Sequence, residues 1–369
     1  MGIIRELWVR PSYIRVLLQK KRHLVRLMNS IDFDARIREA KLMLPPLADY
    51  TDYPYRRVLA GFNPPFIITE MISASALIHG GAKIHMMLTR VSKTQYEGVQ
   101  LVGADPELMS KAARIVEGQG FDYVDINMGC TINKVARQGA GISLMGDEEM
   151  ACRIASSIIE AVGIPVTCKM RLGLNRSSFN AISLSKKLEE LGIAAVTVHG
   201  RSGEKKWGLP VDYKRIRDII EVLSIPVIAN GGVFTGEDAK KMIEKTGAAG
   251  VMPGRGLIGN PWLIPEITVA LAGGNYAPPT LSEKKKTCLL HIEYLRDYYG
   301  DKDGAVRMRR ILPKYFSGCK NIKSLRKDVQ TTWTSAEVEE IIAGILDDST
   351  QGPYYTCQIP IEKRWSAVH

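Results

Sequence analysis

The sequence has no apolar run that approaches the roughly 20 residues a helix needs to cross a bilayer. It has only six cysteines, and they form neither a C-x-x-C pair nor a zinc-like spacing. It also shows no secretory apolar region followed by a small-residue cleavage site. We therefore expect a soluble protein of a reduced, cytoplasmic compartment, with no metal site and no membrane partner. With 45% hydrophobic and 24% charged residues, the chain has the composition of an ordinary globular protein.

A G-x-G-x-x-G fingerprint is missing after the first predicted strand, which argues against the main alternative fold, a doubly wound open sheet. From residue 42 onward the chain instead repeats a short apolar run, a polar or glycine-rich loop and a segment with helical spacing. The eight apolar runs lie at residues 42–48, 66–71, 98–102, 123–127, 165–170, 194–199, 226–230 and 250–254. The segments between them include the candidate crossover helices 106–117, 148–162 and 212–223. Eight such units predict an α/β fold, a (β/α)8 TIM barrel.

Two glycines and two prolines between residues 273 and 280 predict a linker, because these residues continue a helix poorly. Beyond this linker the pattern is purely helical. We therefore expect four parts along the chain: a basic N-terminal extension (1–41), a TIM barrel catalytic domain (42–272), a small C-terminal helical domain (280–347) and a C-terminal tail (348–369).

The formal net charge is +11, which favours a polyanionic partner, with nucleic acid before acidic lipid. Residues 1–41 hold ten Lys or Arg against four acids, and residues 284–329 hold thirteen against five. The two flanks together carry +14, so the stretch between them is close to neutral. A solvated charged helix face is the alternative interpretation of either flank.

In TIM barrels the functional side chains lie at the carboxyl ends of the strands. The residues at the eight predicted strand ends are Pro46, Leu47 and Ala48; Glu70; Gln100; Asn127; Lys169 and Arg171; His199 and Arg201; Asn230, Gly231 and Gly232; Gly254 and Arg255. The glycines after the last two strands predict a phosphate cradle of bare backbone amides, with tight turns as the alternative. Arg255 would add a bidentate charge to this cradle.

A phosphate held there leaves room for a ring system over the centre of the barrel. Lys169 could neutralise negative charge on a reduced flavin or an enolate, and an ammonium at such a strand end needs a partner. Gln100 and His199 could hydrogen-bond the edge of a heterocycle. A structural role for His199 fits the sequence equally well.

With these motifs in order, the chain resembles the dihydrouridine synthases, FMN enzymes that reduce uridine in transfer RNA, over about residues 42–345. The matching stretches are L-P-P-L-A-D-Y-T-D-Y-P-Y-R-R (44–57), Q-L-V-G (100–103), D-I-N-M-G-C (125–130), T-C-K-M-R-L-G (167–173), V-H-G-R (198–201), I-A-N-G-G-V (228–233), V-M-P-G-R-G-L-I-G-N-P-W (251–262) and M-R-R-I-L-P-K-Y-F-S-G (308–318). Their order and their spacing both agree with the family.

The resemblance implies a barrel followed by a helical domain, with RNA in a basic groove between them. It implies FMN contacts from Pro46, Leu47, Ala48, Gln100, Asn127, Lys169, His199, Asn230, Gly231, Gly232, Gly254 and Arg255. Cys130 falls where the family keeps its proton donor, and a thiol is mostly protonated at neutral pH, so it can give a proton to uracil C5. Hydride from the flavin would reach C6, and NADPH would reload the flavin. An inert buried thiol is the alternative for Cys130.

The target uridine is stacked in folded RNA and must be turned out into the pocket, at a cost of about a few kcal/mol. Phosphate contacts from the basic flanks would offset that cost. The candidate substrate and RNA contacts are Arg171, Arg201, Arg307, Arg309, Arg310, Lys314 and Lys320. We expect a monomer acting on transfer RNA, with ribosomal RNA as an open alternative.

The sequence departs from the family pattern at the cysteine loop and at its start. Thr131 stands where the family usually has proline, and the G-I-S-L-M stretch (141–145) is atypical, which puts the rigidity of the loop in question. The basic extension could be an RNA-binding helix, an organelle-targeting segment or a misassigned start. Two other functions stay open: an FMN barrel acting on a free pyrimidine, like dihydroorotate dehydrogenase, and an RNA-binding barrel without catalysis.

Overall fold

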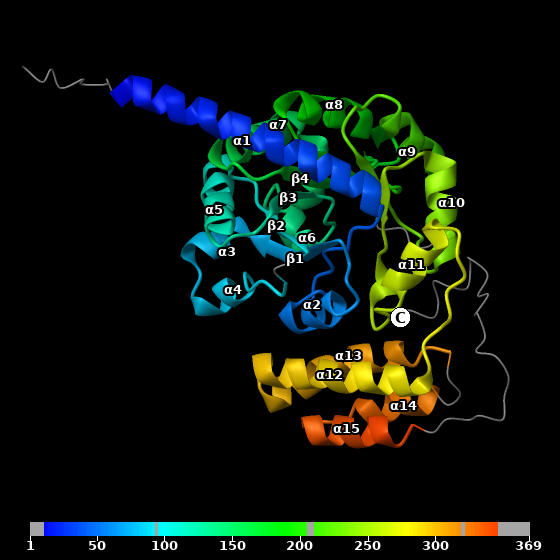
Figure 1. Ribbon diagram of the computed structural model, residues 1–369. Helices are drawn as coiled ribbons and strands as arrows, with labels where there is room; N and C mark the ends of the chain where they lie inside the picture. The colour runs from blue at the N-terminus through cyan, green and yellow to red at the C-terminus, as the bar shows by residue number, and fades with distance from the viewer. Residues whose placement is uncertain (1–10, 93–94, 205–209, 319–321, 346–369) are drawn as a thin grey trace, which may run out of the picture.

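A parallel sheet lies at the centre of the protein in our computed structural model, which describes residues 11–92, 95–204, 210–318 and 322–345 (Figure 1). Seven strands pair in the order β1-β2-β3-β4-β7-β8-β9. They are β1 (Phe66–Ser73), β2 (Tyr96–Val102), β3 (Tyr123–Met128), β4 (Val166–Arg171), β7 (Ala195–His199), β8 (Val227–Asn230) and β9 (Gly250–Met252). A small antiparallel hairpin of β5 (Gly173–Asn175) and β6 (Ser178–Phe179) follows β4 and was not predicted.

The prediction of a first strand at residues 42–48 is wrong. The structure has only an isolated parallel bridge there, between Leu42 and Val251. This segment nevertheless joins the two edges of the sheet. The Met43 N–H donates to Val251 O at 3.1 Å, in β9, and the Leu44 N–H donates to Phe66 O at 3.1 Å, in β1. The prolines at 45–46 have no N–H to donate, so the ladder ends with them. The predicted TIM barrel with helices after it is confirmed.

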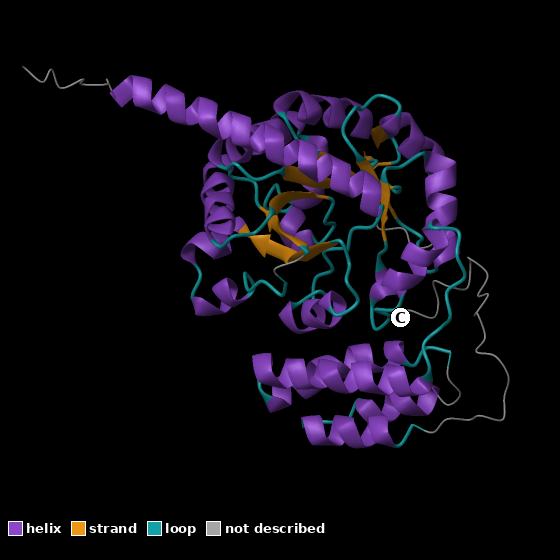
Figure 2. Cartoon of the chain, in the orientation of Figure 1, coloured by secondary structure: helices purple, strands orange, loops and turns teal. Residues whose placement is uncertain are grey.

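Helices enclose the strands on their outer side, and the helices at the end of the chain, α12 to α15, form a separate layer (Figure 2). Their bounds are α1 (Pro11–Ala40), α2 (Tyr53–Ala60), α3 (Ala74–His79), α4 (Ala82–Met86), α5 (Pro106–Gly118), α6 (Asn133–Ala136), η1 (Gly141–Gly146), α7 (Glu148–Ala161), α8 (Ala181–Leu191), α9 (Tyr213–Ile220), α10 (Gly236–Thr246), η2 (Arg255–Leu257), α11 (Leu263–Leu271), α12 (Leu281–Tyr299), α13 (Asp301–Tyr315), α14 (Ile322–Val329) and α15 (Ser335–Ala343). Among these helices none is both long enough and apolar enough to span a membrane. The three expected crossover helices are α5, α7 and α9.

Helix α1, in the basic extension, lies across the amino-terminal end of the barrel (Figure 1). Phe33 and Ile37 are buried there, and the Phe33 ring lies 5.3 Å from that of Phe66 and 5.2 Å from that of Tyr123. Both of these partners are the first residues of their strands. The opposite face of α1 exposes a stripe of apolar side chains: Leu24, Leu27, Met28 and Ile31. This helix therefore closes the end of the barrel that is remote from the strand carboxyl ends.

Aromatic and cationic side chains join the helical layer to the barrel through α2. The Arg57 guanidinium lies 3.6 Å from the centre of the Tyr294 ring, and the Tyr53 and Tyr298 rings are 5.1 Å apart. The Tyr55 ring stacks on His291 at 5.0 Å. These contacts pair α2 residues with α12 residues, so they set the position of the helical layer beside the barrel.

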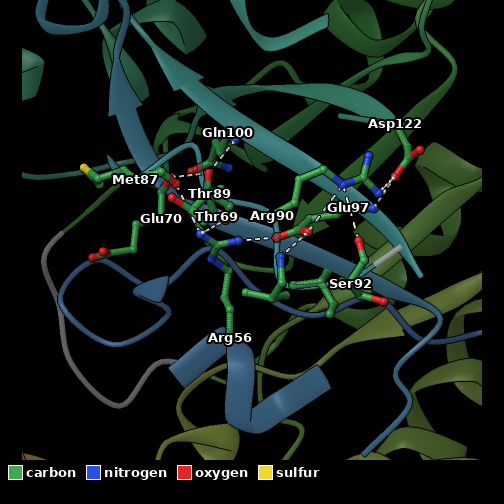
Figure 3. A network of polar contacts seen from close by, with 12 residues as sticks. Arg56, Thr69, Glu70, Met87, Thr89, Arg90, Ser92, Glu97, Gln100 and Asp122 are labelled. Atoms are coloured by element: carbon green, nitrogen blue, oxygen red, sulfur yellow. Dashed lines mark hydrogen bonds and ion pairs between the residues drawn. The ribbon is translucent and has the colours of Figure 1, made fainter. Parts of the chain in front are cut away.

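A buried ion-pair network fixes α2 to the sheet (Figure 3). The side chains of Arg56, from α2, and Glu97, from β2, are 1% and 0% exposed and form a salt bridge. Arg56 also donates to the carbonyl oxygens of Met87, at 3.2 Å, and Thr89, at 3.1 Å. At the other end of the network, Arg90 lies 3.8 Å from Glu97 and 2.7 Å from Asp122. Because charges inside a protein are stable only when paired, this network makes the position of α2 specific.

Candidate active site

The polar residues predicted at the strand ends come together in adjacent rows of the sheet. The parallel register places Gln100 beside Asp125, and Asp125 beside Thr167. One step further toward the carboxyl ends, Asn127 lies beside Lys169. In the next step Arg171 lies beside His199, and His199 beside Asn230. These rows form the floor of the barrel mouth.

Side-chain amides link the floor of the mouth to the cysteine loop. Gln100 Nε2 donates to Asp125 Oδ2 at 2.7 Å, and Asn127 Nδ2 donates to Gln100 Oε1 at 2.7 Å. Asn127 Oδ1 accepts from the backbone N–H of Cys130 at 2.9 Å and of Gly129 at 3.1 Å. The amides of Gln100 and Asn127 therefore bind one another, so their polar atoms are held in place.

The cysteine loop is held at both residues 129 and 130, although Thr131 replaces the proline usual in the family. Arg171 Nε donates to Gly129 O at 2.9 Å, and the Ile142 N–H donates to Cys130 O at 2.9 Å. A Cβ added to Gly141 would lie 3.1 Å from the Cβ of Cys130, so the turn into η1 packs directly on the cysteine. These contacts supply rigidity that the sequence left in question.

Cationic side chains gather around Lys169 at the mouth. Lys169 Nζ donates to Asn230 Oδ1 at 3.2 Å, and burial, with a smaller effect of Arg171, lowers the pKa of Lys169 to about 8. Burial, with the charges of Arg255 and Arg171, likewise lowers the pKa of Arg201 to about 10. Cations that depress one another's pKa raise the potential of the mouth, so this surface suits an anionic ligand.

His199 lies among these cations and is neutral at neutral pH. Burial, together with the positive charges of Lys169 and Arg171, lowers the pKa of His199 well below its usual value. Its Nε2 lies 3.0 Å from Arg201 Nη1. Since an arginine can only donate, Nε2 accepts this hydrogen bond, and Nδ1 carries the proton of the neutral ring.

The glycine loops after β8 and β9 lie against each other, as a phosphate cradle requires. A Cβ added to Gly256 would lie 2.8 Å from Val233 O, so the two loops touch. Gly231 and Gly232 have φ values of +117° and +73°, which L side chains rarely adopt. A Cβ added to Gly254 would meet no heavy atom within 4 Å, so open space adjoins that backbone. With Arg255 at the same place, the residues present fit a phosphate group.

Gly231→Ala tests how strongly this loop depends on glycine. A Cβ there would lie 3.0 Å from His199 Cδ2 on a backbone with φ of +117°. We expect a loss of about 2 kcal/mol in the free energy of unfolding, from strain and from the displaced imidazole. The matched control is Gly247→Ala at the end of α10, where φ is +75° and nothing lies within 4 Å. It should cost about 1 kcal/mol by urea denaturation, and equal losses would contradict the argument.

The loop before α2 supplies the predicted contacts Pro46, Leu47 and Ala48. The Leu47 N–H donates to Thr51 Oγ1 at 2.8 Å, and the Tyr50 N–H donates to Leu47 O at 3.0 Å. Ala48 is exposed, whereas Pro46 and Leu47 are half-buried. This loop is therefore a folded turn that continues from the segment closing the barrel.

Two of the basic residues predicted to contact RNA have partners on the barrel side of α13. Arg310 lies 3.8 Å from the Asp49 carboxylate in the first loop of the barrel, and its side chain is 48% exposed. Lys314 lies beside the loop after β9, because a Cβ added to Gly259 would come within 2.6 Å of its Cβ. Both side chains thus lie at the junction of the barrel and the helical layer.

The remaining predicted RNA contacts differ in their surroundings. The Arg307 guanidinium lies 3.8 Å from the centre of the Tyr299 ring. Arg309 Nε donates to Thr332 O at 2.9 Å, and its guanidinium lies 4.4 Å from the Trp333 ring, which reduces its availability to a phosphate. Lys320 lies outside the described residues.

Asp125 and Glu70 both lie in predicted strands, but no role was predicted for either. The signal for Asp125 was available, because it is the one charged residue in the otherwise apolar and amide run Y-V-D-I-N-M. Burial raises the pKa of Asp125 to about 6, and burial, with nearby Asp52, raises the pKa of Glu70 to about 7. Perturbed carboxyl groups of this kind are typical of functional sites.

Known proteins match this chain over most of its length. The family model for dihydrouridine synthases (Dus) matches residues 43–348. A probable tRNA-dihydrouridine synthase of Rickettsia conorii is 34% identical over 306 residues, covering 82% of this chain and 92% of the relative. The tRNA-dihydrouridine synthase B of Pasteurella multocida is 33% identical over 279 residues, covering 75% of this chain and 84% of the relative. The tRNA-dihydrouridine synthase B of Shewanella oneidensis is 32% identical over 312 residues, covering 84% of this chain and 97% of the relative. The chain therefore belongs to the dihydrouridine synthase family.

Proposed function

We propose that this protein is a flavin-dependent oxidoreductase that converts uridine in transfer RNA to dihydrouridine. The observation that carries the proposal is a mouth that combines a thiol on a held loop, a ring of cations and two touching glycine loops. The names of the relatives support transfer RNA as the substrate. FMN is the proposed cofactor and NADPH the proposed reductant.

The residues that would hold FMN divide between a phosphate end and a ring end. The backbone amides of Gly231 and Gly232, with Gly254 and Arg255, would bind the phosphate. Lys169, on the floor of the mouth, would face the ring system. When bound, the flavin supplies the hydride that uracil accepts at C6. The neutral imidazole of His199 would add a hydrogen-bond donor without another positive charge.

Cys130 is the proposed source of the proton. Addition of hydride at C6 of a conjugated carbonyl leaves an enolate, which needs a proton at C5. The Cys130 thiol gives that proton and becomes a thiolate. Lys169 and Arg171 lie close enough to Cys130 to interact with it electrostatically, and solvent would return the proton to the sulfur.

The RNA would lie at the junction of the barrel and the helical layer. Arg310 and Lys314 lie there, and Arg307 lies on the same helix, α13. Phosphate contacts of this kind would offset the cost of turning the target uridine out of its stack. They also make the affinity for transfer RNA fall as salt rises, with a logarithmic slope of roughly −0.7 to −0.9 for each phosphate neutralised.

The proposal is tested with the purified protein loaded with FMN. We expect NADPH oxidation to depend on unmodified transfer RNA, and mass spectrometry of the digested RNA to show nucleosides that have gained two hydrogens. Free uridine and free orotate serve as controls and should give no turnover. Turnover on a free pyrimidine with none on RNA would overturn the proposal in favour of an enzyme like dihydroorotate dehydrogenase. RNA binding by a protein unable to take up FMN would favour the barrel without catalysis.

A further inference from the structure

Asp125 is a buried carboxylate in the middle of β3, one row below Asn127 and Lys169 in the floor of the mouth. It is only 4% exposed. Its two oxygens accept from different strands, from Gln100 Nε2 in β2 and from Thr167 Oγ1 in β4, each at 2.7 Å. Burial of such a group is costly unless it is fully hydrogen-bonded, so its presence here needs a reason.

The carboxylate determines which way the neighbouring amides face. An ionised carboxylate can only accept, so Gln100 must turn its NH2 group toward Asp125. Its carbonyl oxygen then faces Asn127, which must turn its own NH2 group toward Gln100. Asn127 Oδ1 consequently faces the cysteine loop, where it accepts from the N–H groups of Gly129 and Cys130. Each of these two side-chain amides therefore has one orientation, because the Asp125 carboxylate at the start of the series can only accept.

Reversing the orientation of the Gln100 and Asn127 side-chain amides would break the hydrogen bonds that hold the cysteine loop. If Asn127 turned by half a rotation, its NH2 group would face the two backbone N–H groups, and donors would oppose donors. Leaving buried donors without partners costs about 1–3 kcal/mol each, so the loop would move. The placement of Cys130 thus depends on a carboxylate inside the preceding strand, β3.

The same carboxylate also acts on Lys169 through its charge. Charged and titratable groups reach Lys169 from each neighbouring element: Asp125 from β3, Cys130 from the loop after β3, Arg171 from its own strand and His199 from β7. Asp125 raises the pKa of Lys169, whereas burial and Arg171 lower it to about 8. Removing the negative charge would therefore lower the pH at which Lys169 loses its proton.

We propose that Asp125 is a positioning residue that sets the orientation of the Gln100 and Asn127 side-chain amides and thereby holds the Cys130 loop. The expected effect of Asp125 on turnover rests on the proposed function. Its expected effect on the Cys130 loop does not depend on that function. Two substitutions separate the acceptor oxygens of Asp125 from its charge, because a side chain of nearly the same shape can keep an acceptor without keeping the charge.

Asp125→Leu removes both the acceptor and the charge. Asp125→Asn removes the charge alone, since its oxygen can still accept from Gln100 while its NH2 group donates to Thr167 Oγ1. The matched control is Thr167→Val, which removes only the hydrogen bond that Thr167 Oγ1 donates to Asp125 Oδ1. Melting temperatures establish that each variant is folded.

The first measurement is the rate at which iodoacetamide alkylates Cys130, followed by peptide mass spectrometry without RNA or NADPH. We expect Asp125→Leu to raise this rate about three- to tenfold, because the loop loses its anchor, while Asp125→Asn and Thr167→Val stay near the original rate. A rate in folded Asp125→Leu equal to that of the unaltered protein would overturn the role in positioning.

The second measurement is the pH profile of turnover on transfer RNA. Both Asp125 variants should move the alkaline limb to lower pH by about one unit, whereas Thr167→Val should leave it in place. An unmoved limb in Asp125→Asn would show that the charge of Asp125 does not affect Lys169. If the unaltered protein does not reduce transfer RNA at all, the proposed function fails, and the alkylation rates still decide the role of Asp125 in the loop.

Discussion

Cys130→Ala is expected to lower turnover on transfer RNA by about 10²- to 10⁴-fold, the usual contribution of a positioned general acid. FMN and RNA should bind as before. The hydrogen bonds that hold the loop use the backbone N–H and carbonyl of residue 130 and not its side chain, so alanine keeps them. The measurement is single-turnover formation of dihydrouridine, with flavin content and RNA affinity determined on the same sample.

Cys152→Ala is the control for this substitution. Cys152 is a partly buried free thiol on α7, away from the mouth. Its loss should leave turnover unchanged. If Cys130→Ala turned over as fast as Cys152→Ala, another group would have to deliver the proton, and the assignment would fail.

Arg56→Met should lower the free energy of unfolding by about 3–5 kcal/mol, the usual cost of leaving a buried charge without its partner. Glu97 is fully buried, and the Met87 and Thr89 carbonyls would also lose a donor. The loss should shrink as the pH is lowered. Burial already raises the pKa of Glu97 and Arg56 opposes this, so without Arg56 the pKa rises further. A carboxyl group whose pKa is higher in the folded than in the unfolded protein lowers the free energy of unfolding when it is ionised, at pH values above that pKa. Protonation at lower pH removes this destabilisation.

Two comparisons sharpen this stability prediction. Arg153→Met breaks the exposed pair with Glu149 and should cost less than about 1 kcal/mol. The double variant Arg56→Met with Glu97→Leu should recover much of the loss, because it leaves no unpaired charge. If urea denaturation gave Arg56→Met the same small cost as Arg153→Met, the network would not stabilise the fold as argued.

The strands of the barrel could be predicted because each is a short apolar run between polar loops, a pattern set by burial on both faces. The first run failed as a strand because its prolines, Pro45 and Pro46, cannot donate to a ladder, although Met43 and Leu44 still close the sheet. The β5–β6 hairpin was missed because strands of three and two residues carry no readable period.

The strand-end rule follows from the geometry of parallel strands, and the structure has Gln100, Lys169 and His199 in strands of one sheet, while their roles stay predictions. What a side chain contacts there could not be read from sequence. Arg309 meets a carbonyl 23 residues away, and Arg56 meets a carboxylate 41 residues away. Such pairings depend on how distant elements pack, so a basic stretch predicts a charged face without telling which of its members are already paired.

Helix α1 has a consequence for the order in which the protein folds. The apolar cluster around its Phe33 and Ile37 includes Ile228 and Met252, which lie more than 180 residues later in the chain. The face of α1 that carries Phe33 and Ile37 is therefore fully covered only after the last barrel strand has been synthesised. Because contacts this distant in sequence form late, this face of α1 is hydrophobic surface that stays exposed to aggregation during folding.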